Sequence, residues 1–142
     1  IAAPSARATS QQAPDGSPPE PAVALMAEMC NRCHDSARIL ETRRTRMEWE
    51  DIIHKMIEKG ATGSGQDFET VFAYLLLHHG KIYINDASAD DIMKILGLSQ
   101  KDADAMTAYR TANGPFADVE AVRKVPGIDL KTLDAHIDAV AF

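Results

Sequence analysis

Aromatic residues, cysteines and long apolar runs are all scarce in this sequence of 142 residues. One Trp, three Tyr and four Phe leave a core to be filled by aliphatic side chains and methionine, or by something that is not protein. The two cysteines are too few for a small fold held together by several disulfides. No apolar run approaches the roughly 18 residues that a membrane-spanning helix needs. We therefore expect no membrane-spanning segment.

Basic residues are also in the minority, with 15 Lys and Arg against 21 Asp and Glu and a net charge of −6. This balance argues against a protein whose main activity is to bind nucleic acid through a basic face. We expect the acidic surface to steer the chain toward basic patches on its partners at low salt.

The composition divides the chain into three segments. Residues 1–21 hold five of the seven prolines among Ala, Ser and Gln, which predicts a flexible or polyproline-like tether unless a partner holds it. The chain begins with Ile, so we expect that a leader has been removed or the chain trimmed. We expect one domain over residues 22–80 and a second over residues 81–142.

Helical periodicity dominates both predicted domains. Apolar residues recur at three-to-four spacing over 46–59 and 66–79, and a glycine follows each segment. Residues 81–142 contain an internal repeat in which Gly97 and Gly127 lie in matching surroundings. Each half predicts a helix, a tight glycine turn and a second helix, the last one running to Val140. Only 82–84 has a strand-like pattern, so we predict an all-α fold.

The segment Cys30-Asn31-Arg32-Cys33-His34 carries the clearest chemical signal. Two cysteines three positions apart can reach two vinyl groups along one porphyrin edge, and the adjacent His34 can then bind the iron. This spacing is typical of the covalent attachment of a c-type haem. The alternatives are a redox pair, half of a zinc site or a plain disulfide. A zinc site needs a further ligand pair and a thioredoxin-like pair needs a βαβ setting, and the sequence shows neither.

Residues 22–80 resemble the small monohaem cytochrome c domains found alone or attached to periplasmic dehydrogenases. The resemblance rests on the attachment motif, on Arg43-Arg44, and on a helix with Trp49, Met56 and Gly60 followed by a leucine-rich helix. It implies one haem c, His/Met axial ligation by His34 and Met56, and one-electron transfer without substrate chemistry, hence no enzyme. Met47, His54 or an open position are the alternatives to Met56 as the sixth ligand.

The resemblance also suggests contacts to the rest of the haem. Arg43 and Arg44 could pair with the propionates by bidentate hydrogen bonds, or form a solvated basic turn. Trp49 could pack on the haem edge or donate its indole N–H to a propionate.

Residues 81–142 resemble the tandem helix-hairpin-helix domain of secreted DNA-uptake receptors, through segments such as Leu96-Gly97-Leu98 and Val125-Pro126-Gly127-Ile128. The same repeat serves as a protein-docking module in an extrinsic subunit of photosystem II, so the fold leaves the partner open. Where the DNA-binding version has a second hairpin glycine, this chain has Ser99 and Asp129. We expect Asp129 to cap its own helix and to place a carboxylate where a phosphate would bind.

These features predict a periplasmic or secreted electron-transfer protein that docks on redox protein partners, within a larger complex or alone. A DNA-tethered cytochrome is the first alternative, although seven basic against ten acidic residues in 81–142 disfavour it. A gas sensor or peroxidase with an open distal position is the second.

Overall fold

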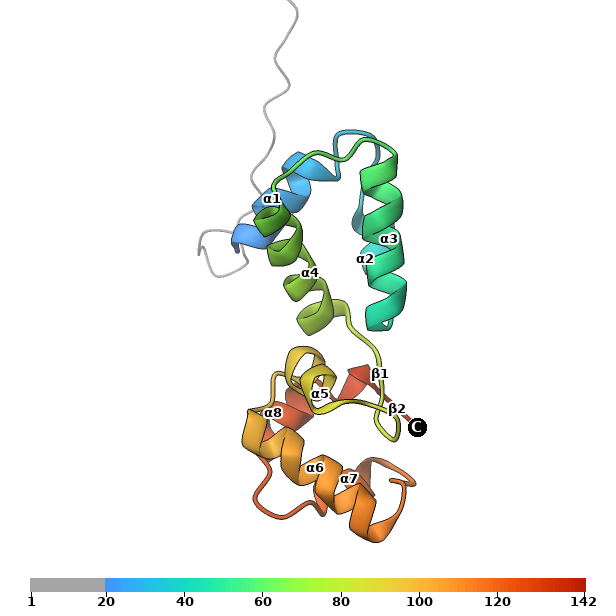
Figure 1. Cartoon of the computed structure of the whole chain (residues 1–142), viewed down its shortest axis with the longest axis vertical. Coiled ribbons are helices and arrows are strands. Elements are labelled where there is room, and N and C mark those ends of the chain that lie inside the picture. The colour runs from blue at the N-terminus through green and yellow to red at the C-terminus, as the bar shows by residue number, and fades with distance from the viewer. Residues whose placement is uncertain (1–19) are drawn as a thin grey trace, which may run out of the picture.

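The computed structural model describes residues 20–142, which are mostly helical (Figure 1). The elements in chain order are α1 (Pro21–Met29), α2 (Ala37–Leu40), α3 (Arg46–Glu58), α4 (Gly65–His79), β1 (Ile82–Tyr83), α5 (Ala89–Leu96), α6 (Gln100–Asn113), α7 (Val119–Arg123), α8 (Leu130–Ala135), a 3-10 turn (Ile137–Ala139) and β2 (Val140–Ala141). The all-α prediction is confirmed. The tether predicted for residues 1–21 lies outside the described residues, except that Pro21 already opens α1.

The N-terminal lobe, residues 20–80, packs α1 and α3 against α4. Both long helices begin with a capping box, in which Thr45 and Glu48 start α3 and Ser64 and Asp67 start α4. Gly60 ends the α3 turn with a φ of +100°, which a residue with a side chain rarely adopts. The buried faces of these helices supply the core residues Met26, Met29, Trp49, Val71, Leu75 and Leu76.

The C-terminal lobe, residues 81–142, consists of two helical hairpins, α5–α6 and α7–α8 (Figure 1). Gly97 and Gly127 turn the two hairpins with φ values of +66° and +75°, as their matching positions in the repeat predicted. A side-chain oxygen caps the start of every helix here: Ser88, Ser99, Asp118 and Asp129. The helices enclose a core of Ile92, Ile95, Leu96, Met106, Val122 and Leu133.

The end of the chain differs from the prediction. The helix expected to run to Val140 ends at Ala135, because the following residue, His136, leaves helical geometry with a φ of −120°. A 3-10 turn then buries Ala139, and the chain forms β2. This strand pairs in parallel with β1, matching Ile82 to Val140 and Tyr83 to Ala141. The strand-like pattern at 82–84 therefore does form a strand, and its partner strand β2 could not be recognised from local periodicity.

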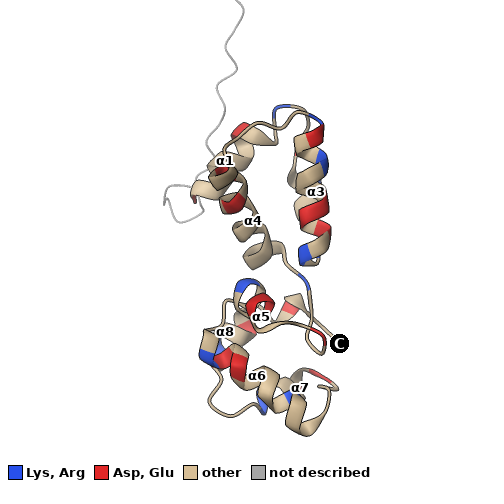
Figure 2. Ribbon diagram, in the orientation of Figure 1, with Lys and Arg blue, Asp and Glu red and all other residues tan. Residues whose placement is uncertain are grey.

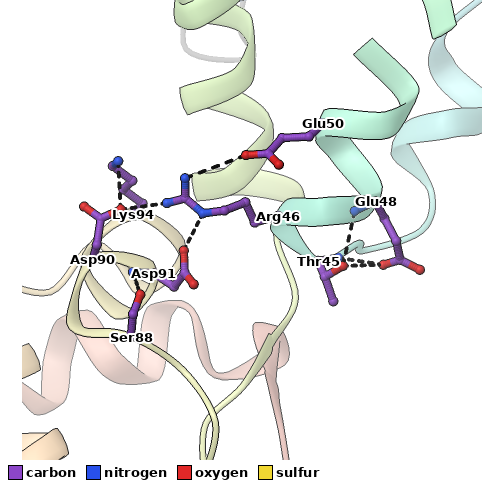
Figure 3. A network of polar contacts seen from close by, with 8 residues as sticks. All are labelled: Thr45, Arg46, Glu48, Glu50, Ser88, Asp90, Asp91 and Lys94. Carbon is purple, nitrogen blue, oxygen red and sulfur yellow. Dashed lines mark hydrogen bonds and ion pairs between the residues drawn. The ribbon is translucent and has the colours of Figure 1, made fainter. Parts of the chain in front are cut away.

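The two lobes contact each other through α4 and α5 and share one continuous buried cluster. Gly80 lies where they meet, and a Cβ there would stand 2.1 Å from the carbonyl oxygen of Leu76 and 2.9 Å from Ile95. Next to it, Arg46 at the start of α3 reaches the carboxylates of Asp90 and Asp91 at the start of α5 (Figure 3). The predicted boundary after residue 80 thus falls at a packed junction.

Charged residues of both signs are interspersed over the two lobes (Figure 2). No helix within residues 20–142 is both long and apolar enough to cross a membrane.

Candidate functional site

The two cysteines lie where α1 ends. Cys30 is the C-terminal cap of α1 and is half-buried, whereas Cys33 is exposed in the turn that follows. No disulfide joins the two, and burial raises the pKa of the Cys30 thiol above its ordinary value. Met26 and Met29 anchor the end of α1 in the core, so they fix the position of the attachment segment.

Two adjoining cavities lie beside this segment and share several lining residues. The inner one, of about 50 Å³, is enclosed by apolar side chains of α1, α3 and α4, including Trp49, Ile53, Phe68, Val71 and Leu75. The outer one, of about 450 Å³, is lined by Met29, Cys30, Arg32, Cys33, His34, Met56, Lys59, Gly60, Ala61 and Thr62. A volume of this size is typical of a cofactor site.

His34 is exposed at the mouth of the outer cavity and lines both cavities. Its Nδ1 lies 3.2 Å from the backbone carbonyl oxygen of Asp35. A carbonyl oxygen only accepts hydrogen bonds, so this contact assigns the proton to Nδ1 and leaves the Nε2 lone pair available. Metal-binding histidines commonly hold their second ring nitrogen in this way.

The three candidates for the sixth ligand occupy different places on α3. Met56 is half-buried and lines both cavities together with Cys30 and His34. Met47 is 76% exposed in the first turn of α3 and lines neither cavity. His54 is exposed and also lines neither. Of the three, the structure brings only Met56 to the attachment segment.

Arg43, Arg44 and Trp49 are tied to the end of α4. The Trp49 ring is 1% exposed and lines the inner cavity, and its Nε1 donates to the His79 carbonyl at 2.9 Å. Arg43 donates to the His78 carbonyl at 3.1 Å, and the Arg44 guanidinium stacks over Trp49 at 5.1 Å. Neither arginine lines a cavity. The single N–H of Trp49 is therefore already used and is not free to donate to a propionate, as the sequence had suggested, whereas the pairing of Arg43 and Arg44 with propionates stays a prediction.

Three polar residues of the cavity lining were not singled out by the sequence reasoning. Arg32 and Lys59 are the charged side chains in the outer lining, and Thr62 adds a hydroxyl. Arg32 lies between the two cysteines, so its place in the motif was an available signal. Lys59 comes to the site because it is the C-terminal cap of α3, and the end of this helix lines the same cavity as the attachment segment.

The residues fit a haem by the chemistry of their donors. Two thiols, an imidazole with a free nitrogen and a thioether line one largely apolar cavity, and these are the groups that attach and ligate haem iron. The structure does not favour zinc, because no group of three or more His, Cys, Asp or Glu able to hold a metal occurs within residues 20–142.

The two hairpin turns of the C-terminal lobe differ in the side chain that accepts hydrogen bonds from the backbone N–H groups at the start of the second helix. Asp129 accepts from the backbone N–H groups of Lys131 and Thr132 at 3.1 and 3.2 Å and from the Thr132 hydroxyl at 2.6 Å. These hydrogen bonds, those from Thr132 above all, lower the pKa of the Asp129 carboxyl. Asp129 therefore caps α8 as predicted. In the first hairpin, the Ser99 hydroxyl accepts from the Asp102 N–H instead.

In comparisons with known proteins, the two halves of the chain match two different families. Residues 12–68 match the haem-binding family described from the alpha subunit of quinohemoprotein amine dehydrogenase A. Residues 78–139 match the helix-hairpin-helix motif. The chain therefore joins a haem-binding region to a helix-hairpin-helix motif.

Relatives among curated proteins cover only part of the chain. It is 38% identical over 63 residues to an uncharacterized protein of Haemophilus influenzae, which covers 44% of this chain and 56% of that protein. It is 36% identical over 53 residues to ComE operon protein 1 of Bacillus subtilis, covering 37% of this chain and 26% of that protein. The chain thus spans little more than half of the first relative and about a quarter of the second. No solved structure matches the chain significantly.

Proposed function

We propose that this chain is a one-electron carrier in which Cys30 and Cys33 hold one haem c covalently and His34 and Met56 are its axial ligands. The observation that carries the proposal is that these four side chains line a single cavity. The match of residues 12–68 to a haem-binding family supports it. Bound there, the haem would supply an iron that cycles between the ferric and ferrous states.

The residues of the chain account for the conditions that such a carrier needs. The apolar side chains of the inner cavity exclude water, and Trp49 closes the end away from solvent. The Asp35 carbonyl orients the His34 imidazole. A thioether ligand is soft and favours the reduced metal, so Met56 would raise the reduction potential.

The C-terminal lobe, in this proposal, docks the carrier on a redox protein partner. Support comes from its acidic balance, with seven basic and ten acidic residues over 81–142, and from Asp129. The Asp129 carboxylate accepts hydrogen bonds from backbone N–H groups at the start of α8, and a bound phosphate would need these same groups. We further propose that the protein acts outside the cytoplasm, in the periplasm or as a secreted protein, in keeping with the cytochrome resemblance.

Optical spectra of the oxidised and reduced protein test the proposed ligands. Met56→Ala should abolish the weak far-red sulfur–iron band of the ferric protein and let the ferrous protein bind carbon monoxide rapidly. Met47→Ala is the matched control on the same helix and should leave both properties unchanged. A wild-type protein that already lacks the band and binds carbon monoxide would instead support a gas sensor or peroxidase with an open distal position.

Covalent attachment has a separate test. After denaturation and organic extraction, the haem should stay with the wild-type polypeptide and leave the Cys30→Ala/Cys33→Ala variant. Haem that is extracted from the wild-type chain would contradict attachment through thioethers.

DNA binding is the second candidate, favoured by the helix-hairpin-helix match and the similarity to ComE operon protein 1. The Ser99 hairpin has no carboxylate at the position equivalent to Asp129, and Lys101 and Lys131 follow the two turns. Titration of a labelled duplex at low and high salt separates the candidates. Tight binding that weakens steeply with salt would establish DNA as a partner, whereas weak binding at low salt supports docking on protein.

A further inference from the structure

The mouth of the outer cavity carries positive charge on a chain that is acidic as a whole. Arg32 and Lys59 are exposed at its rim, together with Cys33, Gly60 and Thr62. The lining contains no carboxylate, whereas the chain has a net charge of −6. The local charge at this opening is therefore opposite in sign to the total.

Neither cation forms an ion pair with another residue of the described part of the chain. Within residues 20–142, the lysines and arginines that form ion pairs are Arg46, Lys55, Lys94 and Arg123. Lys55, one turn before Lys59 on α3, is paired with Asp51. No carboxylate of residues 20–142 therefore competes in an ion pair with a group that approaches Arg32 and Lys59 from solvent.

The mouth is also the side from which the site can be reached. The far end is closed by Trp49, whose ring is 1% exposed and whose N–H is tied to the His79 carbonyl. The exposed lining residues all belong to the turn after α1 and the segment that follows α3. A redox partner that approaches closely therefore meets Arg32 and Lys59.

We infer that Arg32 and Lys59 form a docking rim for the acidic face of a redox protein partner, an inference that rests on the proposed electron-carrier function. The net charge alone predicts a basic partner face, because a chain of −6 repels anions at long range. Salt screens such long-range repulsion within about 8 Å at physiological ionic strength, so charges at the point of contact dominate. The two cations at the rim then select an acidic partner.

Small oxidants of opposite charge test this inference on the full haem-loaded chain. Oxidation of the reduced protein by hexacyanoferrate(III) moves one electron and yields hexacyanoferrate(II), and its second-order rate is followed by stopped flow. From about 0.15 M upward, where the net charge of the chain is screened beyond about 8 Å, we expect this rate to fall as ionic strength rises, and the rate with the cationic oxidant tris(phenanthroline)cobalt(III) to rise. The net charge of the chain predicts the reverse for both, so the signs alone are decisive.

A charge-matched pair of variants locates the effect. Arg32→Gln/Lys59→Gln should slow the reaction with hexacyanoferrate(III) about tenfold at an ionic strength of about 0.15 M, the lower range of electrostatic steering. Lys101→Gln/Lys124→Gln removes two exposed charges from the C-terminal lobe, far from the rim, and should have little effect. The difference should vanish near 1 M salt, where charges are screened within about 3 Å.

The outcomes separate the two proposals. Suppose that the haem is redox-active but the rate with hexacyanoferrate(III) rises with ionic strength, or that the two double variants slow the reaction equally. Either result overturns the docking rim and leaves the electron-carrier proposal intact. Protein without a haem that responds to reductant overturns both. The salt dependence of the wild-type chain decides the matter even if Arg32→Gln/Lys59→Gln fails to take up haem.

Discussion

The guanidinium of Arg46 pairs with the carboxylate of Asp91, although the two residues are 45 positions apart in the chain. Arg46 opens α3 in the N-terminal lobe, and Asp91 lies in the first turn of α5 in the C-terminal lobe. A second nitrogen of Arg46 donates to Asp90 at 2.8 Å, and Asp90 also binds Lys94 (Figure 3). One side chain thus joins the two lobes.

Replacing Arg46 should weaken this junction. Arg46→Met keeps an apolar stem and removes the pairs with Asp90 and Asp91 together with the weaker one with Glu50, and we expect the free energy of unfolding in urea to fall by about 1–2 kcal/mol. The loss should shrink at high salt, because ion pairs at a partly exposed site are screened. Lys55→Met, which breaks the fully exposed pair with Asp51 on the same helix, should cause a much smaller loss, because exposed ion pairs contribute little to stability. Equal losses in the two variants would contradict a special role for Arg46.

Gly80 should tolerate no side chain. Gly80→Ala would place a Cβ 2.1 Å from the Leu76 carbonyl oxygen, which forces the backbone between the lobes to move. We expect a loss of about 1–3 kcal/mol in the free energy of unfolding, typical of overpacking. Gly65→Ala is the control, because a Cβ there meets nothing within 4 Å at the start of α4. It should instead stabilise the protein by about 0.4–1 kcal/mol. A Gly80→Ala protein as stable as wild type would refute the close packing.

His79 should make stability depend on pH. Burial lowers the pKa of its imidazole below the ordinary value of 6.5, so the folded chain binds this proton more weakly than the unfolded chain. The free energy of unfolding should therefore fall as pH drops through and below 6.5, and His79 should contribute no slope well above it. Thermal unfolding of His79→Gln should show a shallower pH dependence than wild type. A steep slope that persists in His79→Gln would contradict this assignment.

Loss of the haem should destabilise the N-terminal lobe. About sixty residues seldom form a stable core alone, and the cavity beside Cys30 would lose its apolar filling. We expect Cys30→Ala/Cys33→Ala to unfold at a lower temperature and less cooperatively by circular dichroism than wild type. Met47→Ala changes an exposed residue and should keep the wild-type transition. A cooperative transition of the double variant near the wild-type midpoint would show that the haem is not part of the core.

Local patterns in the sequence predicted most of the helices and several of the residues that line the site. The periodicity around Trp49 and Met56 predicted α3, and the attachment motif by itself pointed to Cys30, Cys33 and His34. The glycine turns of the repeat were predicted because a left-handed residue is a local requirement.

Relations between distant segments could not be predicted in the same way. The hydrogen bond from Trp49 to His79 spans 30 positions, and nothing near Trp49 indicates which carbonyl accepts it. The same holds for β2, whose two residues form a strand only because β1 lies beside them. Arg32 and Lys59 look like ordinary solvent-exposed charges until the fold brings the ends of α1 and α3 to one cavity.

The close packing at Gly80 and Gly97 determines which contacts the C-terminal lobe would lose if it were separated from the N-terminal lobe. Leu77 of α4 approaches the position of a Gly97 Cβ at 3.3 Å, and the turn at Gly80 covers Ile95. A fragment that starts at residue 81 would keep all four of its helix caps and both hairpins. It would nevertheless expose the side of α5 that α4 now shields, and this bare apolar face would favour self-association. The helix-hairpin-helix half therefore relies on its neighbour for solubility.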